Sequence, residues 1–437
     1  MTIHVPHPAA RAAATRRELT PSSALPFAYF VMAHLGLATA LMALVLWPEL
    51  PGPFFFHPRM VALVHLLTIV WLSGSILGAF YIAAPLVLRM PMPVRPTDWA
   101  AFVAFAIGAV GMVTHFWIGE YDGMAWSAAL VLGTIGRVAG RAWRGLPRAP
   151  VPWPIKLHVG LAFGNILAAG VLGILLGLDR SRGFLGLSPL AVTYAHAHVA
   201  AVGWVAMMVI GLGYRLIPMM LPAAMPTGGH LAVSAVLIQT GVVILVVTLL
   251  ADSRWWPLGG ALVTAGMGSF AVTMRRAVRH RAPRPPALPR RDWAAWQAHA
   301  ALLWLLVAIV LGLILGVPGL ERQHIALMWA YGAAGLLGFL AQMVVGVQGR
   351  LVPMYAWYRA MAWQDGIPPG RAVHDLVSAR FARAIFVAWL IGVPTLTMGL
   401  AGQRAAAIVA GASALLLGTV VNGAYLARML RTAKRPL

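Results

Sequence analysis

Apolar residues occur along the chain in twelve runs, separated by short stretches that are polar or contain proline and glycine. Each run is close to the roughly 20 residues that a helix needs to cross about 30 Å of hydrocarbon at a rise of about 1.5 Å per residue. The pattern therefore predicts an all-α polytopic membrane protein with about 12 transmembrane helices. The predicted spans are residues 25–47, 58–84, 99–118, 123–142, 156–178, 190–213, 230–250, 255–274, 293–316, 324–347, 381–400 and 404–427.

Positive charge alternates from one connecting segment to the next. Arginine and lysine gather after the second, fourth, eighth and tenth runs and at the C-terminal end, whereas the segments between them contain most of the acidic residues. Cytoplasmic loops of membrane proteins carry an excess of arginine and lysine, so the pattern puts these loops and both termini in the cytoplasm. Residues 275–292, which combine arginine with proline, are predicted to be an exposed cytoplasmic loop.

The runs define one domain. Residues 1–24 have no apolar stretch of their own and are predicted to be a cytoplasmic tail, residues 25–427 a single 12-helix membrane domain, and residues 428–437 a second cytoplasmic tail. The first helix must then insert as its own signal. We expect a multi-pass protein of the bacterial inner (plasma) membrane, with the lipid bilayer as its surroundings.

Composition and charge narrow the possible chemistry. Hydrophobic residues make up 60% of the chain and charged residues 10%, whereas soluble proteins carry about 25% charged residues. The basic residues that give the chain its net charge of +22 lie between the apolar runs. They do not form a soluble face with aromatic residues among them, so no nucleic-acid partner is expected. The chain has no cysteine, which excludes disulfides, thiolate metal sites and a covalently attached c-type haem. Any metal chemistry must use histidine.

A spaced set of residues recurs along the chain, which indicates an internal repeat. Histidine is followed by tryptophan, glycine, tyrosine and proline at offsets of 6, 13, 16 and 20, once from His65 and once from His198. A weaker third copy has Ala333 at the histidine position and keeps Phe339, Gly346 and Pro353 in register. The helix before each copy also bears a histidine, at positions 34, 158 and 299. The sequence therefore predicts three pseudo-repeats of four helices, roughly residues 25–150, 151–290 and 291–427.

Histidines are the candidate functional residues of the spans, because polar groups inside a bilayer are costly unless they are paired or functional. His65 and His198 lie seven or eight residues inside their helices, about 10–12 Å below the outer surface at the helical rise. Neutral imidazoles at equal depth on two parallel helices suit the two axial positions of a b-type haem, whose flat apolar ring fits between helices.

A second histidine precedes His198 by two positions. His196 and His198 point about 200° apart on a helix, so their rings cannot grip one metal ion on the same face. They can serve two neighbouring sites, one on each side of the helix. His115, near the outer end of its span, is a further candidate metal ligand at a similar level.

These residues also have a purely structural interpretation. A histidine in a membrane domain often makes a hydrogen bond between helices, and this alternative stays open for the histidines at 34, 115, 158, 299 and 324. The tryptophan, tyrosine and glycine positions of the repeat are interpreted as packing positions, with Gly78 and Gly211 allowing close approach of helices. The 21 methionines are interpreted as core filling in preference to soft copper ligands.

The histidine-bearing runs resemble a known family. The run His196-Ala-His198-x4-Gly203-Trp204-x2-Met207-x3-Gly211-x2-Tyr214-x-Leu216-x-Pro218 resembles the His-x-His helix of haem-copper oxidase subunit I, especially of the cbb3-type oxidases and nitric oxide reductases. The run His65-x5-Trp71-x2-Gly74 is similar to a haem-ligand helix of those proteins. Twelve helices in three groups of four is also the architecture of that family. The NnrS family of haem- and copper-containing proteins is similar as well, although it usually has Glu where this chain has Val199.

The resemblance implies a cofactor set and a role. It implies that His65 and His198 are axial ligands of a low-spin b-type haem (heme b), with His196 turned toward a second haem or a copper site. An oxidoreductase of this kind handles electrons or a diatomic gas, O2 or NO, and takes electrons from a cytochrome donor or other respiratory-chain subunits.

The sequence departs from this family in ways that keep other functions open. The His-x-His lies in the sixth span, whereas the oxidases carry it in the tenth, where this chain reads Tyr331-Gly332-Ala333. The copper ligands and intramembrane acids of the oxidases have no counterpart, so a full copper site and proton pumping are not expected. A multi-pass transporter or metal permease, or a non-catalytic assembly subunit of a respiratory complex, are the alternatives.

Overall fold

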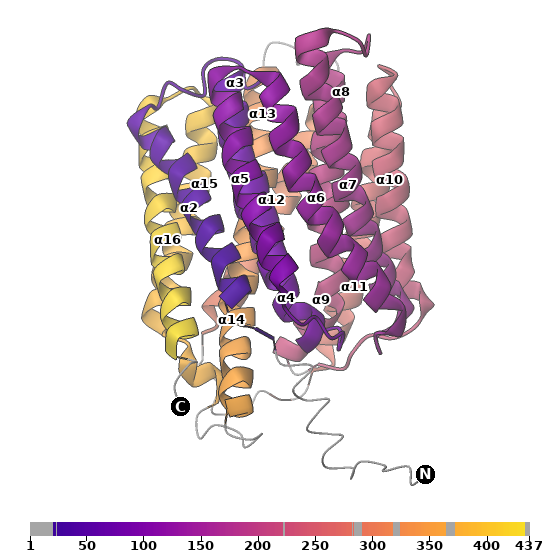
Figure 1. Ribbon diagram of the computed structural model, residues 1–437, viewed down its shortest axis with the longest axis vertical. Helices are drawn as coiled ribbons and strands as arrows, with labels where there is room; N and C mark the ends of the chain where they lie inside the picture. The colour runs from indigo at the N-terminus through magenta and orange to yellow at the C-terminus, as the bar shows by residue number, and fades with distance from the viewer. Residues whose placement is uncertain are drawn as a thin grey trace.

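The computed structural model describes residues 21–22, 24–221, 223–281, 283, 291–317, 324–363 and 372–432. Within these residues the protein is helical and contains no strand, and its helices run roughly parallel and antiparallel in one bundle (Figure 1). Most of the two predicted tails, and part of the predicted 275–292 loop, lie outside the described residues. Helix α2 begins and α16 ends at the same end of the bundle, the lower end in Figure 1.

The long helices follow the predicted spans. The bounds are α2 (Ala24–Leu46), α3 (Pro58–His65) with η1 (Leu66–Ser73) and α4 (Gly74–Leu86), α5 (Pro96–Ile118), α6 (Tyr121–Gly145), α7 (Trp153–Arg182), α8 (Pro189–His198) with η3 (Val199–Ala206) and α9 (Met207–Met220), α10 (Ala232–Leu250), α11 (Trp256–Arg279), α12 (Trp293–Ile314), α13 (His324–Ala333) with η6 (Ala334–Ala341) and α14 (Gln342–Trp363), α15 (Ala379–Ala401) and α16 (Ala405–Thr432).

Within the described ranges, 11 helices are long and apolar enough to cross a membrane. The predicted span at 123–142 is also a helix, α6, of 25 residues, but Arg137 and Arg141 interrupt its apolar run and it is not among the 11. Large apolar side chains such as Val110, Leu303 and Val310 are more than half exposed on the outer helices, as is expected where lipid replaces water as the solvent. The prediction of an all-α, multi-pass membrane protein is confirmed in this form.

Three of the spans contain a π-helical segment at the same place. Each segment is eight residues long and begins directly after His65, His198 or Ala333. A π-helical turn holds more residues than an α-helical turn, and such turns are rare and frequently found at functional sites. Each of the three helices also continues through a proline, at 85, 218 and 353.

The three π-containing helices occupy the centre of the bundle. In each, 67% of the most apolar stretch is buried, against 50% or less in the other candidate spans. Segments η1 and η3 both contact η6, and Trp204 of η3 donates a hydrogen bond of 3.2 Å to Ser73 of η1. Side chains on these helices are therefore the ones that can face each other inside the protein.

Glycines let the helix that precedes each central helix pack closely against it. A Cβ atom at Gly78 would lie 2.9 Å from Cβ of Tyr29 in α2, and one at Gly211 would lie 2.6 Å from Cβ of His158 in α7. Neither Tyr29 nor His158 could move away from an added Cβ atom without a shift of its backbone, because each contact is to the Cβ atom of that residue. The predicted packing role of Gly78 and Gly211 is confirmed.

Candidate functional site: a pair of imidazoles between central helices

Two predicted site residues, His65 and His196, meet between α3 and α8. Their ring centroids are 6.3 Å apart and the ring planes differ by 24°. Nδ1 of His65 donates to the carbonyl oxygen of Val61, one turn earlier, at 2.8 Å. Nδ1 of His196 donates to the carbonyl oxygen of Ala169 in the neighbouring helix α7, also at 2.8 Å.

These hydrogen bonds determine the tautomer of both rings. A neutral imidazole has one donor and one acceptor nitrogen, so a proton on Nδ1 leaves the lone pair of Nε2 free. In the described part of the chain, neither Nε2 has a hydrogen-bond partner. A backbone carbonyl on one ring nitrogen is the usual partner of a histidine whose other nitrogen ligates a metal, because it fixes the ring orientation and raises ligand basicity.

The spacing of the pair agrees with coordination of one metal centre from opposite sides. Two collinear metal–nitrogen bonds of about 2 Å each put the nitrogens about 4 Å apart, and the imidazole centroids about 6 Å apart. The observed 6.3 Å is close to this value. The rings of His65 and Phe116 of α5 have centroids 4.7 Å apart and planes inclined by 33°, so one wall of the site is apolar.

His198 faces a different partner. Its Nδ1 donates to the carbonyl oxygen of Tyr194 at 2.8 Å, and its Nε2 accepts a hydrogen bond of 3.0 Å from the Tyr331 hydroxyl of α13. The rings of His198 and Tyr331 lie 6.2 Å apart with planes at 28°. The expected meeting of His65 with His198 is therefore replaced by a meeting of His65 with His196. Equal depth cannot select between two rings that leave a helix about 200° apart.

His115 lies away from the pair, at the junction of α5 with α6. Its Nδ1 is 2.6 Å from the carbonyl oxygen of Gly111 and 3.4 Å from Oγ of Ser127, and its Nε2 is 3.5 Å from a carboxylate oxygen of Glu120. The structure does not bring His115 together with His65 or His196. Its partners are those of a helix-to-helix hydrogen bond.

Two of the histidines on the helices that precede the central helices, His34 and His158, use both ring nitrogens within the protein. In His34, Nδ1 bonds to the carbonyl oxygen of Phe30 at 2.7 Å and Nε2 accepts from Asn422 of α16 at 3.1 Å. In His158, Nδ1 bonds to the carbonyl oxygen of Pro154 at 2.7 Å and Nε2 lies 2.8 Å from Oγ of Ser234 in α10. His299 is exposed and bonds to its own helix.

Aromatic residues that the sequence did not single out contact the central helices α8 and α13. Phe55, in the segment before α3, is 6.4 Å from Tyr194 of α8 and 5.9 Å from Trp329 of α13, measured between ring centroids. It thereby connects the N-terminal ends of the three central helices. Tyr331 was also missed as a site residue, although it stands two positions before Ala333, as His196 stands two positions before His198.

The prediction of a further metal site has little support from the arrangement of the side chains. Among the residues that the structure describes, no three His, Cys, Asp or Glu side chains lie together as ligands of a metal ion. Met207 and Met208 are buried in the main apolar core, as expected for core filling. No family model matches the chain, and no curated protein is similar to it.

Proposed function

We propose that the chain is a membrane-integral b-type haem protein that handles electrons or a diatomic gas such as O2 or NO. His65 and His196 are the axial ligands in this proposal. One observation carries it: two imidazoles from different central helices lie 6.3 Å apart, and each has Nδ1 bound to a backbone carbonyl and Nε2 without a partner among the described residues. The earlier resemblance to haem-copper oxidase subunit I and to NnrS supports the same class.

The surroundings of the pair suit a porphyrin better than a hydrated metal ion. Phe116 covers His65, and Ala62, Met112 and Met124 form an apolar cluster beside it. A flat, apolar macrocycle gains free energy from such walls, whereas a small divalent ion requires further polar ligands. Haem supplies one-electron redox chemistry when bound, and two strong-field imidazole ligands favour electron transfer over gas binding at that iron. The residues orient the ring and exclude water from it.

A three-unit organisation would explain why the described residues contain one such pair and not three. We propose that the position of His65 in each central helix faces the position of His196 in the next. The second pairing is then His198 with Tyr331, in which a hydrogen bond occupies Nε2 of His198. The third is Ala333 with Leu63, which have no atoms that can ligate a metal. The three π segments, which begin at equivalent positions, support this organisation.

The same proposal includes the orientation in the membrane. The arginine-rich ends of α6, α11 and α16 then lie at the cytoplasmic side, together with both termini. In this proposal α6 also crosses the membrane, and it brings the 11 candidate spans to twelve. The imidazole pair lies in the opposite half of the bundle. An electron donor would approach from the exterior face, near Phe55.

A spectroscopic experiment tests the haem. Protein produced with a full haem supply should show a b-type Soret band and a pyridine haemochrome near one haem per chain, and His65→Ala should remove most of both. His57→Ala is the matched control, since His57 lies in the segment that caps α3 and bonds only locally. A colourless wild-type protein that takes up a solute or copper into liposomes would exclude the proposal and favour the transporter. Copper without haem in the wild type would assign the pair to a copper ion instead.

A further inference from the structure

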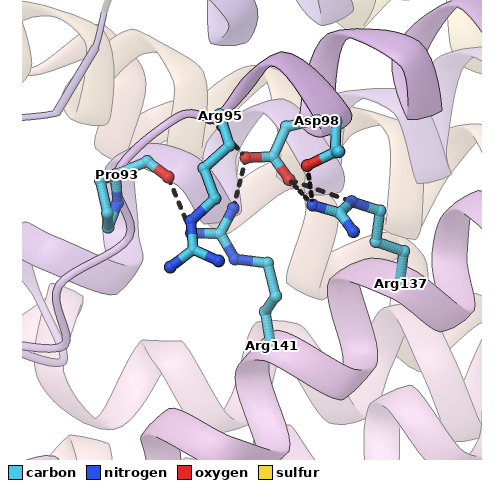
Figure 2. A network of polar contacts seen from close by, with 6 residues as sticks. Pro93, Arg95, Asp98, Arg137 and Arg141 are labelled. Carbon is cyan, nitrogen blue, oxygen red and sulfur yellow. Dashed lines mark hydrogen bonds and ion pairs between the residues drawn. The ribbon is translucent and has the colours of Figure 1, made fainter.

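Arginines at the lower end of the bundle are paired with carboxylates of the chain in two places. In the first, Asp98 of α5 is fully buried and accepts hydrogen bonds from Arg141 at 2.5 Å and from Arg137 at 3.2 Å, both in α6 (Figure 2). One carboxylate thus bridges two guanidinium groups, and Arg141 also bonds to the carbonyl oxygen of Pro93. In the second place, Arg350 of α14 forms an ion pair with Asp292, the N-terminal cap of α12.

Arg215 occupies the position in its central helix that Arg350 occupies in α14. Each arginine stands three residues before the helix proline, Pro218 or Pro353. Helix α7, which packs against α9 and corresponds to α12, is preceded by Pro152. Arg215 therefore lacks the carboxylate that its counterpart has.

Among the residues that the structure describes, no carboxylate forms an ion pair with Arg215. The side chain is half-buried, and its Nε atom is buried without a hydrogen-bond partner in the described part of the protein. Arg89, also positive, from the turn after α4, acts on it electrostatically. A buried donor without a partner and two neighbouring like charges both cost free energy.

The backbone at Arg89 adds to this cost. Arg89 has a φ of 54°, in the left-handed region that residues with a Cβ atom rarely adopt. Strained backbone of this kind clusters at binding and active sites. The conformation holds an exposed arginine next to a half-buried one.

We propose that Arg89 and Arg215 together bind a phosphate group, which takes the place that Asp98 and Asp292 take beside the other arginines. Arginine matches phosphate oxygens with its planar fork of donors. The phosphate comes from the headgroup of an anionic phospholipid in the adjoining leaflet or from a soluble phosphate. This site lies at the end of the bundle opposite the imidazole pair and does not depend on haem.

Phosphate binding to the full-length protein tests the site. In native mass spectrometry the wild type should retain one phosphatidylglycerol and release phosphatidylcholine, and Arg215→Gln should weaken retention by about tenfold or more, the share of one hydrogen bond to a charged group. Arg275→Gln is the matched control, because it removes an exposed arginine of α11 at the same end. Equal retention by Arg215→Gln and Arg275→Gln would overturn the proposal.

Two further measurements complete the test. Inorganic phosphate that displaces phosphatidylglycerol from the wild type would identify a soluble phosphate as a sufficient ligand. Retention of the lipid at high phosphate would identify the headgroup, and either result supports the site. Where Arg215→Gln fails to fold, Arg89→Gln serves in its place, since Arg89 is exposed. Unchanged retention in Arg89→Gln would then contradict the proposal.

Discussion

The histidines in the two halves of the bundle begin with the same hydrogen bond and differ in the second one. His65 and His196 in the half where α3 and α8 begin, like His34 and His158 in the other half, each give Nδ1 to a backbone carbonyl oxygen. For His34 and His158, Nε2 is bound by a side chain of another helix, Asn422 or Ser234. For His65 and His196, no side chain among the described residues binds Nε2. The second ring nitrogen therefore separates histidines that join helices from histidines that can ligate a cofactor.

The largest expected effect is a complete contrast in haem content between the two halves. His196→Ala removes one of the two ligands and should abolish most bound haem, whereas His34→Ala should keep about one haem per folded chain. Haem per protein, measured as pyridine haemochrome on the monodisperse fraction, checks the contrast. Similar haem content in the two variants would show that the partner of Nε2 does not distinguish haem-binding histidines from histidines that join helices.

Replacement of a deeper histidine should instead lower stability. His158 is fully buried, so His158→Ala leaves a cavity and deprives Ser234 of a partner, and the free energy of unfolding should fall by about 2–4 kcal/mol. Unfolding titrations in mild detergent measure this change. The control is His299→Ala, an exposed position, which should change stability little. A His158→Ala protein as stable as wild type would show that its hydrogen bonds do not hold α7 and α10 together.

A smaller effect is expected from loss of the Tyr331 hydroxyl group, which binds His198 on one side of α8. Tyr331→Phe removes the hydrogen bond to Nε2 of His198 and so makes His198 resemble His65. Stability should fall by about 1 kcal/mol, and the haem content at His65 and His196 should not change. Thermal unfolding and the Soret absorbance of the same sample check both statements. Loss of haem in Tyr331→Phe would place the cofactor on the other side of α8.

The smallest change concerns the orientation of one ring. A Cβ atom at Gly173 of α7 would lie 3.0 Å from Cε1 of His196, so Gly173→Ala should displace the imidazole by a few tenths of an ångström. We expect a shift in the low-spin spectrum and in the reduction potential, with haem content retained. Gly164→Ala, where a Cβ atom meets open space in the same helix, is the control and should leave the spectrum unchanged.

Most of the fold could be predicted from the apolar runs. Their length relative to the hydrocarbon thickness identified the helices, but not where each helix ends. Helix α7 extends to 30 residues, beyond the predicted 156–178, and α14 continues past 347 to Trp363, because a helix can leave the hydrocarbon without unwinding. The π segments gave no signal, since one additional residue per turn does not alter an unbroken apolar run.

The candidate site could be predicted in its residues but not in its pairing. Depth and the repeat singled out His65, His196 and His198, and placed His65 and His198 at one depth on two parallel helices. Which ring faces which neighbour depends on the rotation of each helix about its axis, and an apolar sequence on all sides leaves that rotation undetermined. Tyr331 shows the same limit, because its register matched His196 while its residue type did not point to a ligand.

The π segments let each central helix hold one more residue than an α-helix along the same course. A π turn takes up about one residue more than an α turn, so Leu66–Ser73 without one residue would close into an ordinary α-helix. His65 and Gly78 would then keep nearly the same directions relative to each other, and both the packing against α2 and the alignment with His196 could persist. A single insertion or deletion can thus be absorbed at this level during evolution, without disturbing the contacts that assemble the rest of the bundle.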